Sequence, residues 1–397
     1  MDALVIGTGG ARGWPEEGCR CASCMRARSA GVRRAPGRVL IADWLEVIPG
    51  KPLRPGTGRN PPAALHVERL AGGLDITGPD GGRLLLADGP GALPVPTPAA
   101  RPYDIALLDL LASPVQLGQL RMRGLVHERT VVAALYTDDR ITSEDEMARR
   151  CAVWGADHTR DGQVITGPAA VTQASPPRPH RTLIIGGARS GKSTEAELRL
   201  AAEPRVTYLA AGPFAPTRPD SATRGPDHGL DLPGKSDDHS WTGLDGEPDA
   251  EWARRVAIHR ARRPEWWRTV ESLDVAGMLR AETGALLVDG IGTWLAAVLD
   301  QAGMWADERP DERSEAGPGR PDPLTLVQAA IDELVDAWRQ TSALVVAVTD
   351  QVGSGLVPAH PAGRVFRDQL GWLNQRLAAE SELNLQVIAG RVTALPG

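Results

Sequence analysis

The sequence has no long apolar run. None of its stretches approaches the roughly 20 consecutive apolar residues that a helix needs to cross a bilayer, which excludes a protein with a membrane-spanning helix. Its start, MDALVIGTGGARG, lacks the basic segment followed by an apolar segment that marks a secretory leader. We therefore expect a cytoplasmic protein.

The sequence also lacks an excess of one charge. Its 44 basic and 50 acidic residues leave a formal net charge of −6, and long runs of like charge are few. Proteins that bind polyanions usually present a strongly basic face. We therefore expect no nucleic-acid partner.

Cysteine is scarce, with four residues in a chain of 397. Three of them are crowded together as Cys19, Cys21 and Cys24, while Cys151 stands far along the chain. In a cytoplasmic protein such a cluster indicates either a metal site or three reduced thiols, and it argues against a disulfide framework.

The chain length suits two hydrophobic cores better than one. The proline-rich stretch ASPPRPH, residues 174–180, cannot continue a helix or a central strand, so we place a linker there. Residues 1–173 contain short apolar runs bounded by Gly, Pro or Asp, which predict a smaller, strand-rich domain. These runs are Ala3–Ile6, Val39–Ile41, Leu84–Leu86, Ile105–Leu111 and Val131–Leu135.

Residues 181–397 alternate between strand-like and helix-like patterns. This order predicts an α/β domain with a mostly parallel sheet and helices on both faces. The expected strands are Thr182–Ile185, Val206–Ala210, Ala285–Asp289, Leu344–Thr349 and Leu385–Ile388. The expected helices include Thr194–Ala202, Ala250–Ala261, Leu324–Gln340 and Ala362–Ala379. Residues 213–248 and 306–323 are rich in Pro, Gly, Asp and Arg, and we expect mobile surface insertions there.

The motif GGARSGKS satisfies the pattern G-x-x-x-x-G-K-[ST] directly between a predicted strand and a predicted helix. Its glycines let backbone N–H groups converge on phosphate oxygens, and the helix N-terminus adds partial positive charge. Lys192 is expected to reach the β and γ phosphates, and Ser193 to place its hydroxyl on a magnesium ion. A glycine-rich turn without a ligand is the alternative, which the flanking strand and helix disfavour. The motif predicts a nucleoside triphosphate site and does not distinguish between a kinase, an ATPase and a GTPase. Its residues are Gly186, Gly187, Ala188, Arg189, Ser190, Gly191, Lys192 and Ser193.

Further motifs follow the loop in a defined order. Residues 249–259 read D-x-E-x-x-x-R-V-x-x-H, and residues 263–271 read R-P-x-x-W-x-T-x-E. Residues 352–358 and 364–375 read VGSGLVP and RVFRDQLGWLNQ. From about residue 180 to the end, the chain closely resembles the adenosylcobinamide kinase / adenosylcobinamide-phosphate guanylyltransferase family.

The resemblance implies that His259 attacks the α-phosphate of GTP and carries the GMP group. A neutral imidazole is a competent nucleophile at physiological pH. A lone histidine on a helix is ordinarily a surface or core residue, and the flanking motif reverses that interpretation. Asp289 is expected to contact magnesium at the end of its strand, with capping of a helix at Gly290–Leu299 as the alternative. Further nucleotide contacts are assigned to Ala210, Ala211, Gly212, Arg260, Ala261, Arg262, Arg263, Glu271 and Asp289.

The sequence departs from the family pattern at two places. Gln351 stands where the family usually has Glu, and Asp289-Gly290 replaces a more usual acid–Cys pair. If that Glu takes part in catalysis or holds a metal, Gln351 is expected to weaken one activity.

The opening of the chain resembles the start of metallo-β-lactamase-like phosphodiesterases. The shared features are IGTGG, the cysteine cluster and the run RVLIAD at residues 38–43. The catalytic H-x-H-x-D-H of that superfamily is absent, and His66, His127 and His158 are solitary, so we expect a degenerate domain without hydrolase activity. The resemblance makes Cys19, Cys21 and Cys24 candidate ligands of a structural zinc ion, with His158 or Cys151 as the fourth ligand.

The resemblance implies an enzyme of cobalamin biosynthesis that uses Mg²⁺, GTP and ATP, with adenosylcobinamide and its phosphate as substrates. It also implies a homo-oligomer, with a trimer suggested. Two alternatives stay open: a guanylyltransferase that has lost the kinase step, and a non-catalytic GTP-binding regulatory protein. Whether ATP or GTP feeds the kinase step is likewise open.

Overall fold

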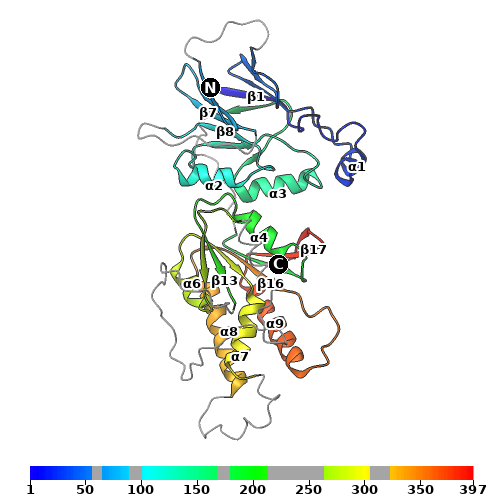
Figure 1. Cartoon of the computed structure of the whole chain (residues 1–397), viewed down its shortest axis with the longest axis vertical. Helices are drawn as coiled ribbons and strands as arrows, with labels where there is room; N and C mark the ends of the chain where they lie inside the picture. The colour runs from blue at the N-terminus through cyan, green and yellow to red at the C-terminus, as the bar shows by residue number, and fades with distance from the viewer. Residues whose placement is uncertain (56–64, 89–100, 168–178, 213–262, 305–321, 397) are drawn as a thin grey trace. The chain divides into compact units, whose positions relative to one another are not determined.

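The computed structural model describes residues 1–55, 65–88, 101–167, 179–212, 263–304 and 322–396. The chain divides into two compact units (Figure 1), an N-terminal unit of Met1–Arg178 with Ala201–Pro204 and a C-terminal unit of Pro179–Leu200 with Arg205–Gly397. Within the described ranges, no helix is both long and apolar enough to cross a membrane.

The N-terminal unit is built on two sheets that share one core. The first sheet has the order β11-β1-β2-β3-β4, with β1 (Asp2–Gly7), β2 (Arg38–Ile41), β3 (Leu45–Val47), β4 (Arg54–Pro55) and β11 (Gln163–Thr166). The second has the order β10-β9-β8-β7-β6-β5, with β5 (His66–Leu70), β6 (Gly73–Thr77), β7 (Arg83–Ala87), β8 (Ile105–Leu108), β9 (Val131–Ala134) and β10 (Asp157–His158). Alternate residues of β1, such as Ala3 and Val5, are fully buried in a cluster that also contains Leu84 and Ile105 of the second sheet. This unit is strand-rich, as the sequence predicts.

Three helices complete the described part of the N-terminal unit: α1 (Ala22–Ser29), α2 (Val115–Met122) and α3 (Glu144–Trp154). The start and end of α3 follow from local chemistry. The hydroxyl of Ser143 accepts a hydrogen bond from the backbone N–H of Glu146, and acidic side chains fill the first turn. Gly155 ends the helix with a left-handed φ of 64°, a conformation that glycine adopts without steric cost.

The C-terminal unit contains one seven-stranded sheet of order β14-β13-β15-β16-β12-β17-β18. Its strands are β12 (Arg181–Gly186), β13 (Val206–Ala210), β14 (Arg268–Glu271), β15 (Ala285–Asp289), β16 (Leu344–Asp350), β17 (Leu383–Ile388) and β18 (Arg391–Ala394). All neighbouring strands run parallel except β18, which pairs antiparallel with β17. The carboxyl ends of β12, β13, β15 and β16 therefore meet at one edge of the sheet.

Helices cover both faces of this sheet. Among the described residues they are α4 (Lys192–Leu200), α6 (Val275–Ala281), α7 (Ile291–Gln301), α8 (Pro323–Gln340) and α9 (Pro361–Ala379). One core contains buried side chains of α6, α7, α8 and α9, and the other contains those of α4. Adjacent residues of β12 show the division, because Leu183 belongs to the first core and Ile184 to the second. The α/β class with a mostly parallel sheet is confirmed.

Most predicted elements of the C-terminal unit occur within a few residues of their expected bounds. The predicted helix Ala250–Ala261, the insertion at 213–248, residues 174–178 of the linker and residues 306–321 of the second insertion lie outside the described residues. The edge strand β14 was not predicted, because its sequence RTVE contains a single apolar residue. β14 lies at the edge of the sheet and three of its four residues are exposed, so it does not need the apolar run of a central strand.

Candidate active site

The loop between β12 and α4 has a backbone that depends on its glycines. Gly191 has a φ of 99°, a left-handed conformation that side chains disfavour, and Arg189 also has a positive φ of 56°. A Cβ atom at Gly186 would lie 2.5 Å from Ser190 Oγ and 2.8 Å from the Val387 carbonyl oxygen. The chain can therefore turn sharply from the strand into the N-terminus of α4, which is what a phosphate-binding loop requires.

Lys192, the first residue of α4, is held at the mouth of this loop. Its Nζ lies 2.9 Å from Asp350 Oδ1 and donates to the Gly187 carbonyl at 3.2 Å. Asp350 ends β16 and is in register with Gly186, the last residue of β12. The ammonium group is thus placed between a carboxylate and the loop backbone, where an incoming phosphate group can replace the carboxylate as its partner.

A second set of contacts links Ser193 to the neighbouring strands. The Ser193 hydroxyl donates to Asp289 Oδ1 at 3.3 Å, and the Tyr208 hydroxyl donates to Asp289 Oδ2. The guanidinium of Arg263 stacks 3.2 Å from the centre of the Tyr208 ring. Burial, together with the charge of Asp289, raises the pKa of Tyr208 far above its ordinary value, so the hydroxyl stays protonated and donates. Asp289 does not cap the helix that follows it, because the N-cap of α7 is Gly290.

The small residues predicted to approach the nucleotide lie at the same edge of the sheet. Ala210 is in register with Glu271 of β14 and with Asp289 of β15. The N–H of Ala211 donates to the Asp289 carbonyl at 3.0 Å. At Gly212 an added Cβ would lie 2.8 Å from the side chain of Thr293 in the first turn of α7. Open α/β sheets bind their ligands outside this edge.

Part of the predicted site lies outside the described residues. These positions are His259, Arg260, Ala261 and Arg262. Arg263, the next residue in the chain, is described and stacks on Tyr208. The remaining loop positions, Gly187, Ala188, Arg189 and Ser190, connect β12 to α4 as their order in the sequence predicts.

Three residues at this edge were not predicted from the sequence. Asp350 is the last residue of a buried, mostly apolar strand, as Asp289 is, and that shared pattern is the signal in the sequence that could have identified it. Tyr208 lies at the centre of the buried strand β13, whose sequence VTYLA gives no local signal for a contact with a distant carboxylate. Asn374 is buried, accepts from the Thr349 hydroxyl at 2.7 Å and donates to the Asp350 carbonyl at 3.1 Å.

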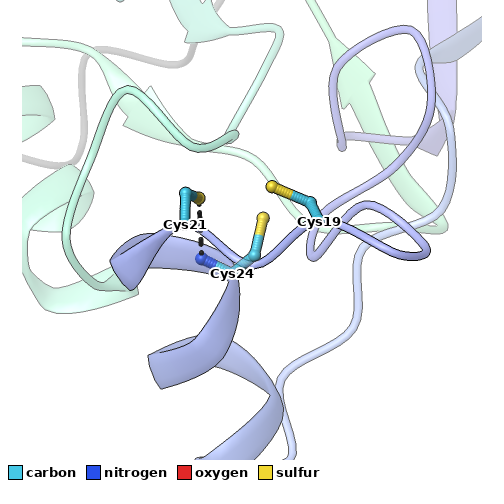
Figure 2. Close-up of side chains that lie close together, drawn as sticks. All are labelled: Cys19, Cys21 and Cys24. Atoms are coloured by element: carbon cyan, nitrogen blue, oxygen red, sulfur yellow. Dashed lines mark hydrogen bonds between the residues drawn. The ribbon is translucent and has the colours of Figure 1, made fainter.

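In the N-terminal unit the three clustered cysteines face one another (Figure 2). The sulfur atoms of Cys19, Cys21 and Cys24 all lie within 4.8 Å of one another. Hydrogen bonds, first from the Cys24 backbone N–H and then from Cys19, lower the pKa of the Cys21 thiol, whereas burial raises the pKa of Cys24 to about 11. Among the described residues, no other Cys, His, Asp or Glu belongs to this group.

Neither candidate for the fourth ligand, His158 or Cys151, belongs to the group that the three cysteines form. His158 Nε2 lies 3.2 Å from Arg34 Nη2 and 3.4 Å from Thr137 Oγ1, and Cys151 is buried on α3. Burial also lowers the pKa of His158.

Comparisons with known proteins concern the C-terminal part of the chain. A sequence model of the family described as "Cobinamide kinase / cobinamide phosphate guanyltransferase" matches residues 241–395. The chain is similar to the bifunctional adenosylcobalamin biosynthesis protein CobP of Pseudomonas aeruginosa, with 33% identity over 224 residues that cover 55% of this chain and 98% of that protein. It is also similar to the bifunctional adenosylcobalamin biosynthesis protein CobU of Escherichia coli and of Salmonella typhimurium, each 30% identical over 52% of this chain and 95% of the relative.

Proposed function

This chain belongs to the cobinamide kinase / cobinamide phosphate guanyltransferase family, and we propose that it phosphorylates adenosylcobinamide with ATP or GTP and then transfers GMP from GTP to the product. The observation that supports this proposal most strongly is the placement of Lys192 and Ser193. Each contacts an acid at the carboxyl edge of the sheet, Asp350 and Asp289 respectively. One loop can serve both steps, because both begin with an anchored triphosphate.

In the first step the loop and Lys192 bind the phosphates and orient the γ-phosphoryl group toward the substrate hydroxyl. The hydroxyl of Ser193 and the carboxylate of Asp289 are hard oxygen donors, which fit a magnesium ion. When bound, magnesium neutralises charge on the β and γ phosphates. Tyr208 keeps the Asp289 carboxylate oriented by its hydrogen bond.

In the second step, we propose that His259 is the nucleophile, a role that rests on the family motif. A bond forms between an imidazole nitrogen and the α-phosphorus of GTP, and pyrophosphate leaves with the electron pair of the broken P–O bond. The phosphate of adenosylcobinamide phosphate then attacks the same phosphorus and releases the imidazole. Arg263 comes shortly after His259 in the sequence, and its guanidinium stacks on the Tyr208 ring. We propose that it offers positive charge to the leaving pyrophosphate.

The test is incubation of the purified protein with α-labelled GTP, followed by denaturation and detection of bound label. We expect an acid-labile GMP adduct in the native chain and in His127→Ala, which changes a histidine of the N-terminal unit. His259→Ala is expected to form no adduct and no adenosylcobinamide-GDP, while it still phosphorylates adenosylcobinamide. An adduct in His259→Ala would show that another residue is the nucleophile.

The same experiment separates the alternative functions. A GMP adduct without phosphorylation of adenosylcobinamide would indicate a guanylyltransferase that has lost its kinase step. GTP binding with neither reaction would indicate a regulatory protein.

We also propose that Cys19, Cys21 and Cys24 hold a structural zinc ion. Tetrahedral thiolate ligands at about 2.3 Å from zinc stand about 3.8 Å apart, which three sulfurs within 4.8 Å can reach with small side-chain rotations. The lowered pKa of Cys21 favours the thiolate that zinc requires. We expect one zinc per chain by elemental analysis and none in Cys21→Ser with Cys24→Ser; full metal content in that double variant would refute the site.

A further inference from the structure

Asp350 lies where the phosphoryl-transfer chemistry of the C-terminal unit would occur. It ends β16, the strand directly beside β12, and is in register with Gly186 at the start of the phosphate-binding loop. The N–H of the next residue, Gln351, donates to the Gly186 carbonyl at 3.0 Å. The end of β16 is therefore tied to the loop that would hold the triphosphate.

Three separate elements position Asp350, two at its carboxylate and one at its backbone carbonyl. Its Oδ1 lies 2.9 Å from Lys192 Nζ at the start of α4. Its Oδ2 occupies space next to α7 that only glycine leaves free, because a Cβ atom at Gly292 would lie 2.7 Å from that oxygen. Its carbonyl is held by the buried amide of Asn374 on α9. A carboxylate positioned in this way is preorganised for contact with a ligand at the loop.

The other groups at this edge are engaged differently. Asp289 receives hydroxyl hydrogen bonds from Ser193 and Tyr208, which suits an acid that binds a metal ion. The side-chain amide of Gln351 is exposed, donates to Ser354 Oγ at 3.0 Å, and cannot accept a proton at neutral pH. Asp350 instead contacts Lys192, the cation that would bind the phosphate oxygens of the triphosphate. When Lys192 turns to the γ-phosphate, the Asp350 carboxylate is left beside the group to be transferred.

We propose that Asp350 is the proton acceptor of the kinase step, an inference that rests on the function proposed above. The substrate hydroxyl oxygen forms a bond to the γ-phosphorus, and the bond from that phosphorus to the β,γ-bridging oxygen breaks. The electron pair of the broken bond stays on the departing nucleoside diphosphate, and the hydroxyl proton passes to Asp350. The chain thereby carries at position 350 the carboxylate that the family pattern places at position 351.

The test compares Asp350→Asn with the native chain in two assays. Transfer of γ-labelled phosphate to adenosylcobinamide, measured with GTP and separately with ATP, reports the kinase step. The GMP adduct with α-labelled GTP reports the guanylyl transfer. Loss of a general base lowers such rates by about 10²–10⁴-fold. We expect that loss in kinase kcat, with the affinity for GTP and the yield of GMP adduct within about threefold of native. The matched control is Asp336→Asn, an exposed acid of α8, which is expected to leave both assays unchanged.

Other outcomes would overturn the proposal. If Asp350→Asn lowers adduct formation and GTP affinity as much as the kinase rate, Asp350 only positions Lys192. If saturating magnesium restores kcat, Asp350 acts on the metal. Moving the carboxylate with Asp350→Asn and Gln351→Glu together is expected to recover at least a tenth of the native kinase rate, and no recovery would count against a role that depends on the carboxylate. A native chain that forms the adduct but has no kinase activity would instead refute the kinase half of the proposed function.

Discussion

The hydroxyl of Tyr208 offers a selective way to perturb the acid that faces Ser193. Tyr208→Phe removes one oxygen atom and keeps the buried ring on which Arg263 stacks. The Asp289 carboxylate loses the hydrogen bond at Oδ2, while its contact with Ser193 through Oδ1 remains geometrically available. The substitution therefore acts on the orientation of Asp289 and leaves the packing of β13 intact.

The magnitude follows from the chemistry of this bond. A hydrogen bond to a charged acceptor contributes about 1.5–3 kcal/mol, and each 1.4 kcal/mol corresponds to about tenfold in an equilibrium constant. Asp289 is only half-buried, so water replaces part of the lost donor. We expect the low end of that range, with the magnesium concentration for half-maximal kinase activity raised by roughly tenfold.

The assay is a magnesium titration of the kinase rate at saturating GTP. Tyr208→Leu is the matched control, since it removes both the hydroxyl and the ring, and it is expected to impair formation of the GMP adduct as well, because Arg263 loses its support. Binding of GTP in the presence of a chelator is expected to be unchanged in Tyr208→Phe. An unaltered magnesium requirement in a folded Tyr208→Phe variant would refute the role assigned to the hydroxyl.

Three further outcomes are expected. Gly292→Ala would force the Asp350 carboxylate to move, because the added Cβ would lie 2.7 Å from Oδ2, so the kinase rate should fall by at least about tenfold. The control is Gly371→Ala, which should leave the kinase rate unchanged because its added Cβ meets no atom within 4 Å. Asn374→Leu leaves the buried Thr349 hydroxyl and the Asp350 carbonyl without their hydrogen-bond partner. The free energy of unfolding, measured by urea titration, should fall by about 2–4 kcal/mol. Burial raises the pKa of the Cys151 thiol to about 12, so the unfolded chain loses this proton at a lower pH than the folded chain. The free energy of unfolding should therefore fall as the pH rises from about 9, by up to about 1.4 kcal/mol per pH unit. Urea titrations at pH 8 to 10.5 measure this slope, and Cys151→Ala should reduce it.

The sequence alone determined the features that depend on neighbouring residues. The phosphate-binding loop, its strand and its helix form one continuous segment, so the glycine spacing and the apolar run predict their order and shape. The α/β class follows in the same way, since each buried strand and each amphipathic helix carries its own periodicity. The crowding of Cys19, Cys21 and Cys24 was also visible, because the three lie within six consecutive positions.

Tertiary structure decided which distant residues meet at the site. Asp289 and Asp350 both end apolar strands, and nothing in the local pattern indicates that the first would contact Ser193 and the second Lys192. The order of strands in the sheet decides which aspartate contacts which residue, because β16 lies directly beside β12 while β15 lies one strand further away. The same order brings Tyr208 of β13 next to Asp289 of β15 across a gap of 81 residues. Contacts of this kind arise from the pairing and register of strands, which no short stretch of sequence encodes.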